Sequence, residues 1–230
     1  MGTFKLADNQ TGNLAKYQSD LPFAVTRLDD FFNAIAGLIA VVTPSVVLNV
    51  GCGEGLDMKS IYDRLDARFA YGCGLDLRVE ALKMASRVLI PYKFDVLQGD
   101  LYHLPLSLAR FDLILCLEVL EHLSCPEQLL SDLSQRYSGH CLFSVPNEPA
   151  YRLTRLLLLR RNIRQLGNHP DHRHHWSKGG FARLMSEFFT VDQVVDPFPW
   201  TAVLCHSMAR PQGQGAKGKH RLPTQGPARL

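Results

Sequence analysis

The sequence predicts an α/β fold in which helices cover both faces of a doubly wound, mostly parallel sheet. Short apolar runs rich in β-branched residues alternate with segments of helical periodicity, and strands separated by helices pair in parallel. One apolar run passes directly into a glycine-rich turn, Gly51 to Gly55, which is typical of the first strand-to-helix connection in such sheets. The 230 residues suffice for one domain of this kind with a full core and are too few for two.

The elements follow one another in a regular order. Pro91 and Gly139 each come after the end of a helix, and Pro126 begins one, as these residues commonly do. Helices are expected over Phe23–Val42, Leu56–Leu65, Val79–Leu89, Pro126–Tyr137 and Lys178–Phe188. Strands are expected over Ser45–Val50, Phe69–Leu75, Lys93–Gln98, Phe111–Leu117, Cys141–Val145, Val191–Val195 and Thr201–Ser207. No helix separates the last two strands, so we expect them to form a closing hairpin at the sheet edge.

Three segments fall outside this regular core. Residues 1–22 are polar and are expected to form an N-terminal arm or lid, before a domain over residues 23–209. Residues 147–178, approximately, form an insertion between the fifth strand and the next helix. Residues 210–230 are rich in Gly, Pro, Gln and basic residues, a composition that predicts disorder.

One uncharged stretch, Phe31 to Gly53, has the length of a membrane span. Pro44 interrupts it, and Asn33 and Asn49 dilute it. A core helix, a turn and a buried strand explain it better, so no integral membrane association is expected.

Charge and cysteine usage limit the partners and the compartment. The net charge is +3, but the segment 210–230 carries five basic residues and no acid, so the remainder carries −2. This balance argues against a broad nucleic-acid-binding face. None of the six cysteines has the spacing of a metal knuckle, and no secretory signal precedes the first helix. Buried free thiols in a reducing, cytoplasmic setting are therefore expected.

The glycine turn is the strongest local motif. Gly51, Gly53 and Gly55 follow a buried strand, and glycine there lets the backbone turn sharply and approach a ligand closely. An ordinary tight turn is the alternative. A dinucleotide-binding turn would need glycine where Leu56 stands. The spacing Gly-x-Gly-x-Gly is instead the one associated with S-adenosylmethionine.

Acidic residues end the next strands. Asp76 ends the second strand, where a carboxylate can accept hydrogen bonds from ribose hydroxyls; a helix N-cap is the alternative. Asp100 with Leu101 ends the third, where the pair can bind an adenine ring; a plain turn aspartate is the alternative. Glu118 follows the fourth strand and places a polar group at the edge where ligands bind in such folds.

Together these motifs resemble the class I S-adenosylmethionine-dependent methyltransferase family, in particular the small-molecule branch of ubiquinone- and menaquinone-pathway enzymes. The resemblance covers about residues 14–210 and is carried by Val47-Leu-Asn-Val-Gly-Cys-Gly-Glu-Gly55, Gly74-Leu-Asp-Leu77 and Leu117-Glu-Val-Leu-Glu-His-Leu123. It implies a Rossmann-like seven-stranded sheet of order 3-2-1-4-5-7-6 with an antiparallel last strand. The cofactor would be S-adenosyl-L-methionine, with the glycines at its methionine part, Asp76 at the ribose and Asp100 with Leu101 at the adenine. Asn49 departs from the acid that many members carry in the first strand. The cofactor-binding residues implied are Gly51, Cys52, Gly53, Gly55, Asp76, Leu77, Asp100, Leu101 and Glu118.

Two absent motifs narrow the acceptor. Enzymes that methylate nucleic-acid amino groups carry Asn/Asp-Pro-Pro-Tyr/Phe after the fourth strand, whereas this chain has Leu117-Glu-Val-Leu. Cytosine C5 enzymes need a nucleophilic cysteine, and Cys116 lies within an apolar strand. A small-molecule acceptor, and no nucleic acid, is therefore expected.

The insertion contains four histidines within Gly167–Ser177 and is expected to lie over the substrate. Histidine suits the removal of a proton from a hydroxyl acceptor, so His175 and His172 are the candidate bases, with His122 behind them. Solvated or loop-bracing histidines are the alternative. His172 and His175 with Asp171 could also gather a divalent ion, but methyl transfer needs none and no metal is assigned. Arg152 to Arg164 forms a basic, leucine-rich helix that we expect to pack on the domain, a lipid contact being the alternative.

The expected function is methyl transfer from S-adenosylmethionine to oxygen, nitrogen or carbon of a small molecule. A non-catalytic cofactor-binding module is one alternative. An RNA or protein methyltransferase, with the basic tail as an anchor, is the other. The acceptor and the oligomeric state do not follow from the sequence.

Overall fold

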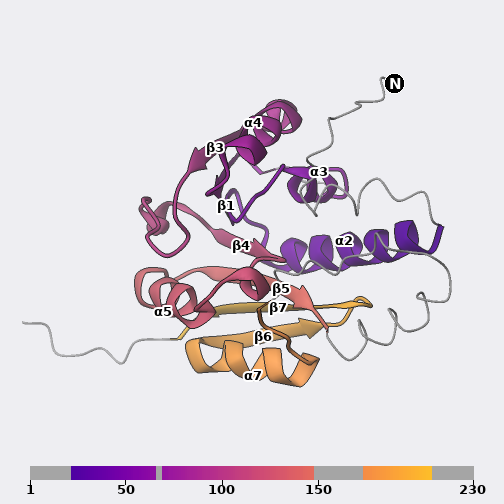
Figure 1. Cartoon of the computed structure of the whole chain (residues 1–230), viewed down its shortest axis with the longest axis vertical. Helices are drawn as coiled ribbons and strands as arrows, with labels where there is room; N and C mark the ends of the chain where they lie inside the picture. The colour runs from indigo at the N-terminus through magenta and orange to yellow at the C-terminus, as the bar shows by residue number, and fades with distance from the viewer. Residues whose placement is uncertain (1–21, 66–68, 148–172, 209–230) are drawn as a thin grey trace, which may run out of the picture.

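A seven-stranded sheet crosses the molecule in the order β3-β2-β1-β4-β5-β7-β6 (Figure 1). The computed structural model describes residues 22–65, 69–147 and 173–208. β1 to β5 pair in parallel, and β7 lies antiparallel between β5 and β6. The strand order and the antiparallel last strand that the sequence predicts are both confirmed.

The elements begin and end close to their predicted bounds. The strands are β1 (Val46–Val50), β2 (Tyr71–Asp76), β3 (Phe94–Gln98), β4 (Leu113–Leu117), β5 (His140–Pro146), β6 (Phe189–Val195) and β7 (Trp200–Ser207). The helices are α2 (Pro22–Val42), α3 (Leu56–Tyr62), α4 (Val79–Val88), α5 (Pro126–Arg136) and α7 (Lys178–Phe188). Short 3-10 turns cover Ile90–Tyr92 (η1), Leu108–Arg110 (η2) and Leu120–His122 (η3). Three predicted segments lie outside the described residues: the N-terminal arm, nearly all of the insertion with its expected leucine-rich helix, and the tail.

Several bounds differ from the prediction by one to three residues, and two of the differences have a local reason. α3 ends at Tyr62 rather than Leu65 because the N–H of Arg64 bonds the Ile61 carbonyl in a tighter turn. β2 begins at Tyr71 rather than Phe69, since the N–H groups of Ala70 and Tyr71 both donate to the Ser45 carbonyl where the strand joins the sheet.

Helices cover the two faces of the sheet in separate groups. α2, α3 and α4 pack on one face around Ile35, Met58 and Ala85. α5 and α7 pack on the other, around Leu130 and Phe181. β4 is buried at every position, which is the pattern of a parallel strand covered on both sides.

The uncharged stretch from Phe31 to Gly53 resolves into the end of α2, a turn and β1, as predicted. Within the described ranges, no helix combines the length and the apolar character that crossing a membrane requires.

The six cysteines are free thiols. Five are buried as expected, and Cys125, just before α5, is exposed. Burial raises the pKa of the Cys116 thiol above its ordinary value, and the charge of Glu121 adds to this effect. Cys116 is therefore a neutral core residue, in agreement with its exclusion as a nucleophile.

Candidate functional site

The predicted ligand-binding residues follow four neighbouring strands at one edge of the sheet. Gly51 comes directly after β1, Asp76 ends β2, Asp100 follows β3 and Glu118 follows β4. Because these strands are parallel neighbours, their carboxyl ends meet at the same edge, where ligands bind in α/β sheets.

The glycine loop, Gly51–Gly55, requires glycine for conformation and for space. Gly51, Gly53 and Gly55 have φ angles of 78°, 52° and 77°, in the left-handed region that favours glycine. A Cβ atom on Gly51 would lie 2.4 Å from a methyl carbon of Val119, and one on Gly55 would lie 2.9 Å from a methyl carbon of Leu89. The loop therefore cannot accept side chains at these positions without rearrangement.

Backbone and carboxylate contacts attach the loop to β2. The N–H groups of Gly51 and Cys52 donate to the Leu75 carbonyl at 2.7 and 3.0 Å, and the Gly53 N–H donates to Asp76 Oδ2 at 2.9 Å. A Cβ atom on Gly74 would lie only 2.8 Å from Sγ of Cys52, so the missing side chain at Gly74 makes room for Cys52. Burial, and then the charge of Asp76, raises the pKa of the Cys52 thiol well above its ordinary value, so this residue packs as a neutral group.

Asp76 joins the loop to the start of α4. Its Oδ1 accepts hydrogen bonds from the backbone N–H and the Nε of Arg78, at 2.9 and 3.3 Å, and its side chain is only 10% exposed. Arg78 also reaches Glu54 Oε1 at 3.5 Å. Arg78 occupies the N-cap position of α4, so Asp76 orients the cap residue and is not itself the cap.

Apolar side chains are exposed beside Asp76. Leu77 is 63% exposed, and Val79 and Leu97 are also exposed. Leu77 and Val79 follow β2 and Leu97 lies in β3, at the side of the edge where the resemblance to methyltransferases expects the ribose and adenine.

Asp100 and Leu101 lie in the turn that follows β3. Oδ1 of Asp100 accepts the Tyr102 N–H at 2.9 Å, and Oδ2 lies 3.1 Å from His103 Nδ1. The Tyr102 N–H, and secondly His103, lower the pKa of Asp100 below its usual value. Leu101 packs against the core. In this structure Asp100 makes the contacts that the turn-aspartate alternative expects.

Glu118 joins β4 to β5 and β7. Ser144 Oγ donates to Oε1 at 3.2 Å, and Trp200 Nε1 donates to Oε2 at 2.6 Å. The centroid of the Trp200 ring lies 4.8 Å from that of the Phe31 ring in α2. Glu118 has a φ of 57°, a conformation that is uncommon outside glycine and that concentrates at functional sites.

The end of the insertion returns to this part of the edge. The N–H groups of Arg173 and His174 donate to the Glu121 carbonyl at 2.8 and 3.3 Å. Trp176 forms a parallel bridge with Asn147, so the two ends of the insertion meet. The His174 ring stacks on Trp176 at 5.3 Å between centroids.

The candidate histidines are placed unequally. His122 ends η3 and is half-buried, and His175 is exposed. The contact of Arg173 and His174 with Glu121 brings the segments that carry His175 and His122 side by side. His172 lies outside the described residues.

Sequence reasoning missed four residues that shape the site. Arg78 and Ser144 stand next to recognised motifs, so their closeness to Asp76 and to the end of β5 was an available signal. Val119 lies inside the recognised segment Leu117–Leu123, but its contact with Gly51 could not be read from that segment. Trp200 gave no signal, since it acts through a contact with a distant segment. The contact between Trp200 and Glu118 spans 82 positions of the sequence.

Comparison with known proteins finds methyltransferases by sequence and by structure. A family model described as a methyltransferase domain matches residues 17–194. The chain is 31% identical over 119 residues to a ubiquinone biosynthesis O-methyltransferase of Chromobacterium violaceum, covering 48% of each chain. Matches of this kind span less than half the length of the curated relatives.

Two solved structures show the same fold at low identity. The magnesium protoporphyrin IX methyltransferase of Synechocystis PCC 6803, with bound S-adenosylhomocysteine, superposes with a TM-score of 0.62 at 13% identity, covering 86% of this chain and 93% of that one. The small RNA methyltransferase HEN1 superposes with a TM-score of 0.58 at 19% identity, covering 76% of this chain and 24% of that one. The family model matches most of the chain, and the sheet order and the glycine loop agree with it. The chain therefore belongs to the class I S-adenosylmethionine-dependent methyltransferase family.

Proposed function

We propose that the chain transfers the methyl group of S-adenosylmethionine to oxygen, nitrogen or carbon of a small-molecule acceptor. One observation carries this proposal. The glycine loop follows β1 with three left-handed glycines, and the Asp76 carboxylate of β2 fixes its backbone. Such a loop at the carboxyl edge leaves the backbone open to close approach by a ligand.

The residues present fit the proposed cofactor. The three glycines carry no side chains and turn the backbone sharply after β1, so the methionine part could approach the backbone closely. Asp76 supplies the carboxylate expected at the ribose, and the Arg78 and Gly53 contacts hold it in place. The exposed side chains of Leu77 and Val79 offer an apolar surface for adenine.

The acceptor side supplies groups for alignment and proton removal. S-adenosylmethionine provides a methyl group on a positively charged sulfur. When bound, it would supply this methyl group to the acceptor atom by in-line displacement, with the electron pair of the carbon–sulfur bond left on the sulfur. An oxygen acceptor must also lose its proton, and the exposed His175 is the base that we propose. The relative named as a ubiquinone biosynthesis O-methyltransferase supports testing an oxygen acceptor first.

Calorimetry with S-adenosylhomocysteine tests the cofactor assignment. We expect Asp76→Ala to weaken binding by about 10–100-fold, the equivalent of one or two charge-assisted hydrogen bonds. Asp95→Ala is the matched control: Asp95 lies in the adjacent strand β3, and its carboxylate accepts from the Tyr71 hydroxyl. Equal affinities for the wild type and Asp76→Ala, or no binding by either, would overturn the assignment.

Incubation with metabolite extracts and S-adenosylmethionine tests the acceptor class. We expect a small molecule to gain the mass of one methylene group with the wild type and not with Asp76→Ala. Cofactor binding without any methylated product would instead identify a non-catalytic cofactor-binding module.

An RNA acceptor is the second candidate, and the five basic residues without an acid in residues 210–230 favour it. Deletion of residues 210–230 separates the two candidates. A large loss of activity on RNA after the deletion supports the second candidate, and unchanged activity on a small molecule supports the first. A cytoplasmic location, suggested by the free cysteines, belongs to this proposal.

A further inference from the structure

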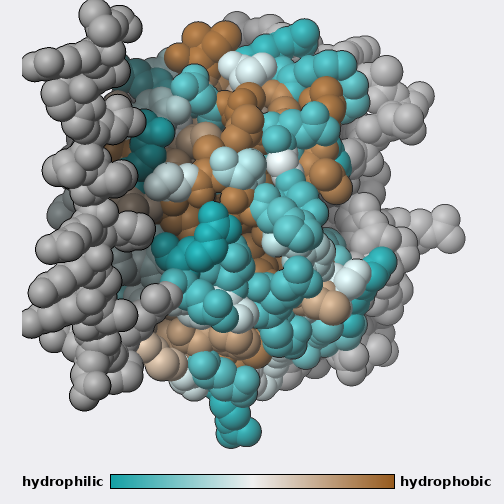
Figure 2. All heavy atoms as spheres, turned by 90° about the vertical axis from the view of Figure 1, so that its left-hand side faces the viewer, coloured by the Kyte–Doolittle hydropathy of each residue, from teal (hydrophilic) through white to brown (hydrophobic). Residues whose placement is uncertain are grey.

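Two histidines and an aspartate meet at the opposite edge of the sheet from the glycine loop. His140 begins β5, His206 lies near the end of β7 and Asp192 lies in the edge strand β6. Figure 2 shows the side of the molecule on which β7 ends, at the left of Figure 1: apolar side chains gather in its upper and central part, and polar side chains border them. His140 also lines a shallow pocket of about 480 Å³ between the end of α2 and the start of β5.

The sheet register brings these three side chains together. His140 and His206 are direct partners in the antiparallel pair of β5 and β7, so their side chains leave the same face of the sheet. The register of β6 against β7 shifts between Val191 and Gln193, which makes Asp192 the extra residue of a β-bulge. Bulges redirect a side chain, and here the Asp192 carboxylate reaches His206.

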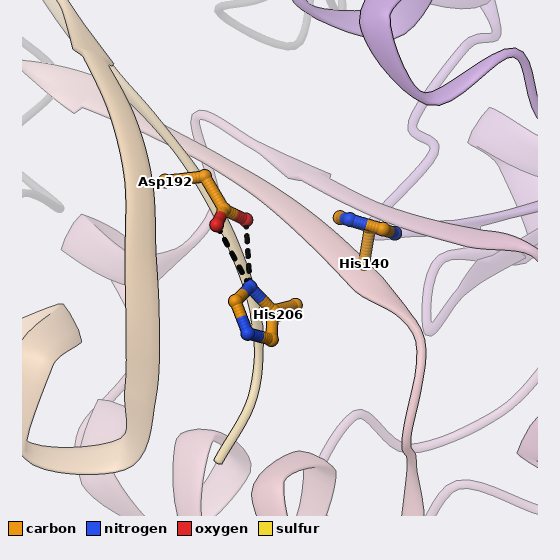
Figure 3. A group of neighbouring side chains, drawn as sticks. All are labelled: His140, Asp192 and His206. Atoms are coloured by element: carbon orange, nitrogen blue, oxygen red, sulfur yellow. Dashed lines mark hydrogen bonds and ion pairs between the residues drawn. The ribbon is translucent and has the colours of Figure 1, made fainter. Parts of the chain in front are cut away.

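The donor atoms are near enough for one ion to join them. Nδ1 of His206 lies 2.8 and 2.9 Å from the two carboxylate oxygens of Asp192. The His140 ring lies across from this pair, 5.9 Å from the His206 ring (Figure 3). One donor atom from each residue lies within 4.8 Å of the other two, and no second group of this kind occurs among the residues that the structure describes.

We propose that His140, Asp192 and His206 bind a divalent transition metal ion, with Zn²⁺ as the best fit. Imidazole and carboxylate are ligands of Zn²⁺, at about 2.0–2.2 Å, so its tetrahedral donors stand about 3.4 Å apart. The donor atoms of the three residues lie within 4.8 Å of one another, so some of them must move closer to reach this separation. The side chains of Asp192 and His206 are 29% and 41% exposed, which leaves them room to move and leaves a fourth position on the ion for water. Zn²⁺ takes the place of the hydrogen bond between His206 Nδ1 and Asp192, and His206 binds it as a neutral imidazole that carries its N–H on Nε2.

The position of the site indicates what the ion does. β6 is the last strand of the sheet and pairs only with β7 among the described strands. An ion held by β5, β6 and β7 links this edge strand to the parallel part of the sheet. Because the site lies at the amino end of β5, away from the glycine loop, we infer a stabilising role that does not depend on the proposed methyl transfer.

Another Asp–His pair provides the matched control. Asp100 and His103 lie 3.1 Å apart and are more exposed than Asp192 and His206. Among the described residues, no third ligand of the kind that His140 provides stands beside Asp100 and His103. If an exposed Asp–His contact were enough to bind zinc, both pairs would bind it.

Zinc titration of the full chain, freed of metal by a chelator, tests the proposal. We expect His140→Gln and His206→Gln each to weaken zinc binding by at least about 10-fold, since even outer-shell partners contribute that much. His103→Gln should bind as the wild type does. Zinc should raise the Tm of the wild type and of His103→Gln and leave that of the two site variants unchanged. Should a glutamine variant fail to fold, Asp192→Asn keeps a hydrogen-bond acceptor for His206 while removing the anionic ligand.

Nuclear magnetic resonance identifies the ligands directly. We expect the imidazole signals of His140 and His206 to shift together at one equivalent of Zn²⁺. The proposal is overturned if these signals stay in place. It is also overturned if His175→Gln abolishes zinc binding while His206→Gln does not, because the ion then belongs to the histidine-rich insertion.

Discussion

The glycine-loop side of the site (Gly51–Gly55 with Asp76) and the acceptor side (Glu118, His122 and residues 173–176) lie at one edge of the sheet but are assembled differently. The resemblance implies a cofactor contact for Glu118, but we place it on the acceptor side because its carboxylate accepts from Ser144 and Trp200. On the glycine-loop side, one carboxylate fixes the loop across two adjacent strands, from Asp76 to Gly53. On the acceptor side, Glu118 receives hydrogen bonds from Ser144 and Trp200, and the insertion returns to Glu121.

This difference separates two functions that a methyltransferase must combine. Neighbouring, sequence-local elements hold the proposed cofactor, whereas distant segments enclose the proposed acceptor. Gly51 packs against Val119, which follows Glu118, and so links the two sides. Changes at Asp76 should nevertheless leave the acceptor side largely intact, because distant residues contribute nearly independently. For acceptor-side variants, cofactor affinity and turnover are measured separately, and a variant that lowers both would contradict the separation.

The largest effect is expected from His175→Ala on the acceptor side. His175 is exposed, and the neighbouring His174–Trp176 stack fixes the segment that carries it. Loss of a general base should lower turnover by about 10²–10⁴-fold, with little change in calorimetric affinity for S-adenosylhomocysteine.

Other outcomes for His175→Ala would assign a different role. Equal losses of affinity and turnover would make His175 a structural residue of the site. Turnover restored by added zinc or magnesium would make it a metal ligand. Unchanged turnover would show that alignment alone suffices for the acceptor.

Gly51→Ala should break the glycine-loop side. Its Cβ would meet Val119 at 2.4 Å in a backbone with φ of 78°, so the free energy of unfolding should fall by about 2–4 kcal/mol. Cofactor affinity should fall by at least about 10-fold, the equivalent of 1.4 kcal/mol. Gly37→Ala is the control: it lies in α2 with open space around the new Cβ, and it should stabilise the chain by about 0.5–1 kcal/mol. A stable Gly51→Ala variant with normal affinity would show that the loop accepts a side chain.

The same difference decides what the sequence could predict. Gly51, Asp76 and Asp100 each follow a strand that alternating apolar runs reveal, so their order along the edge followed from strand order alone. The bond from Trp200 to Glu118 depends on how β7 inserts between β5 and β6, and local composition carries no record of that pairing. The bulge at Asp192 was equally hidden, because a register shift belongs to the strand pair and not to one strand.

Trp200→Phe should have a moderate effect confined to the acceptor side. Phenylalanine keeps an aromatic ring beside Phe31 and removes only the indole N–H that donates to Glu118 at 2.6 Å. We expect a loss of about 1–2 kcal/mol in stability, since the partner is charged but only partly buried. Turnover should fall by about 10-fold, and cofactor affinity should change by less than about twofold.

A double-variant cycle checks that Trp200 acts through Glu118. Glu118→Gln combined with Trp200→Phe should lower turnover no further than the stronger single variant. Additive losses would show that the two residues act separately, and a loss of cofactor affinity would place Trp200 on the glycine-loop side as well.

The smallest effect is expected at Asp100, an exposed residue that follows β3 beside the glycine-loop side. The Tyr102 N–H is the main cause of its lowered pKa, and His103 is the second. His103→Gln should therefore raise the pKa of Asp100 only part of the way towards its usual value of about 3.9, as carbon NMR of the carboxyl group across a pH series would measure.

Because the folded-state pKa of Asp100 is the lower one, this carboxylate stabilises the fold above its unfolded pKa, and the contribution disappears as the pH falls through the folded value. The group stays ionised at neutral pH in either case, so cofactor affinity at pH 7 should change by less than about twofold. A larger loss at pH 7 would mean that His103 itself contacts the adenine end of the cofactor, and the glycine-loop side would then extend beyond the Asp100 turn.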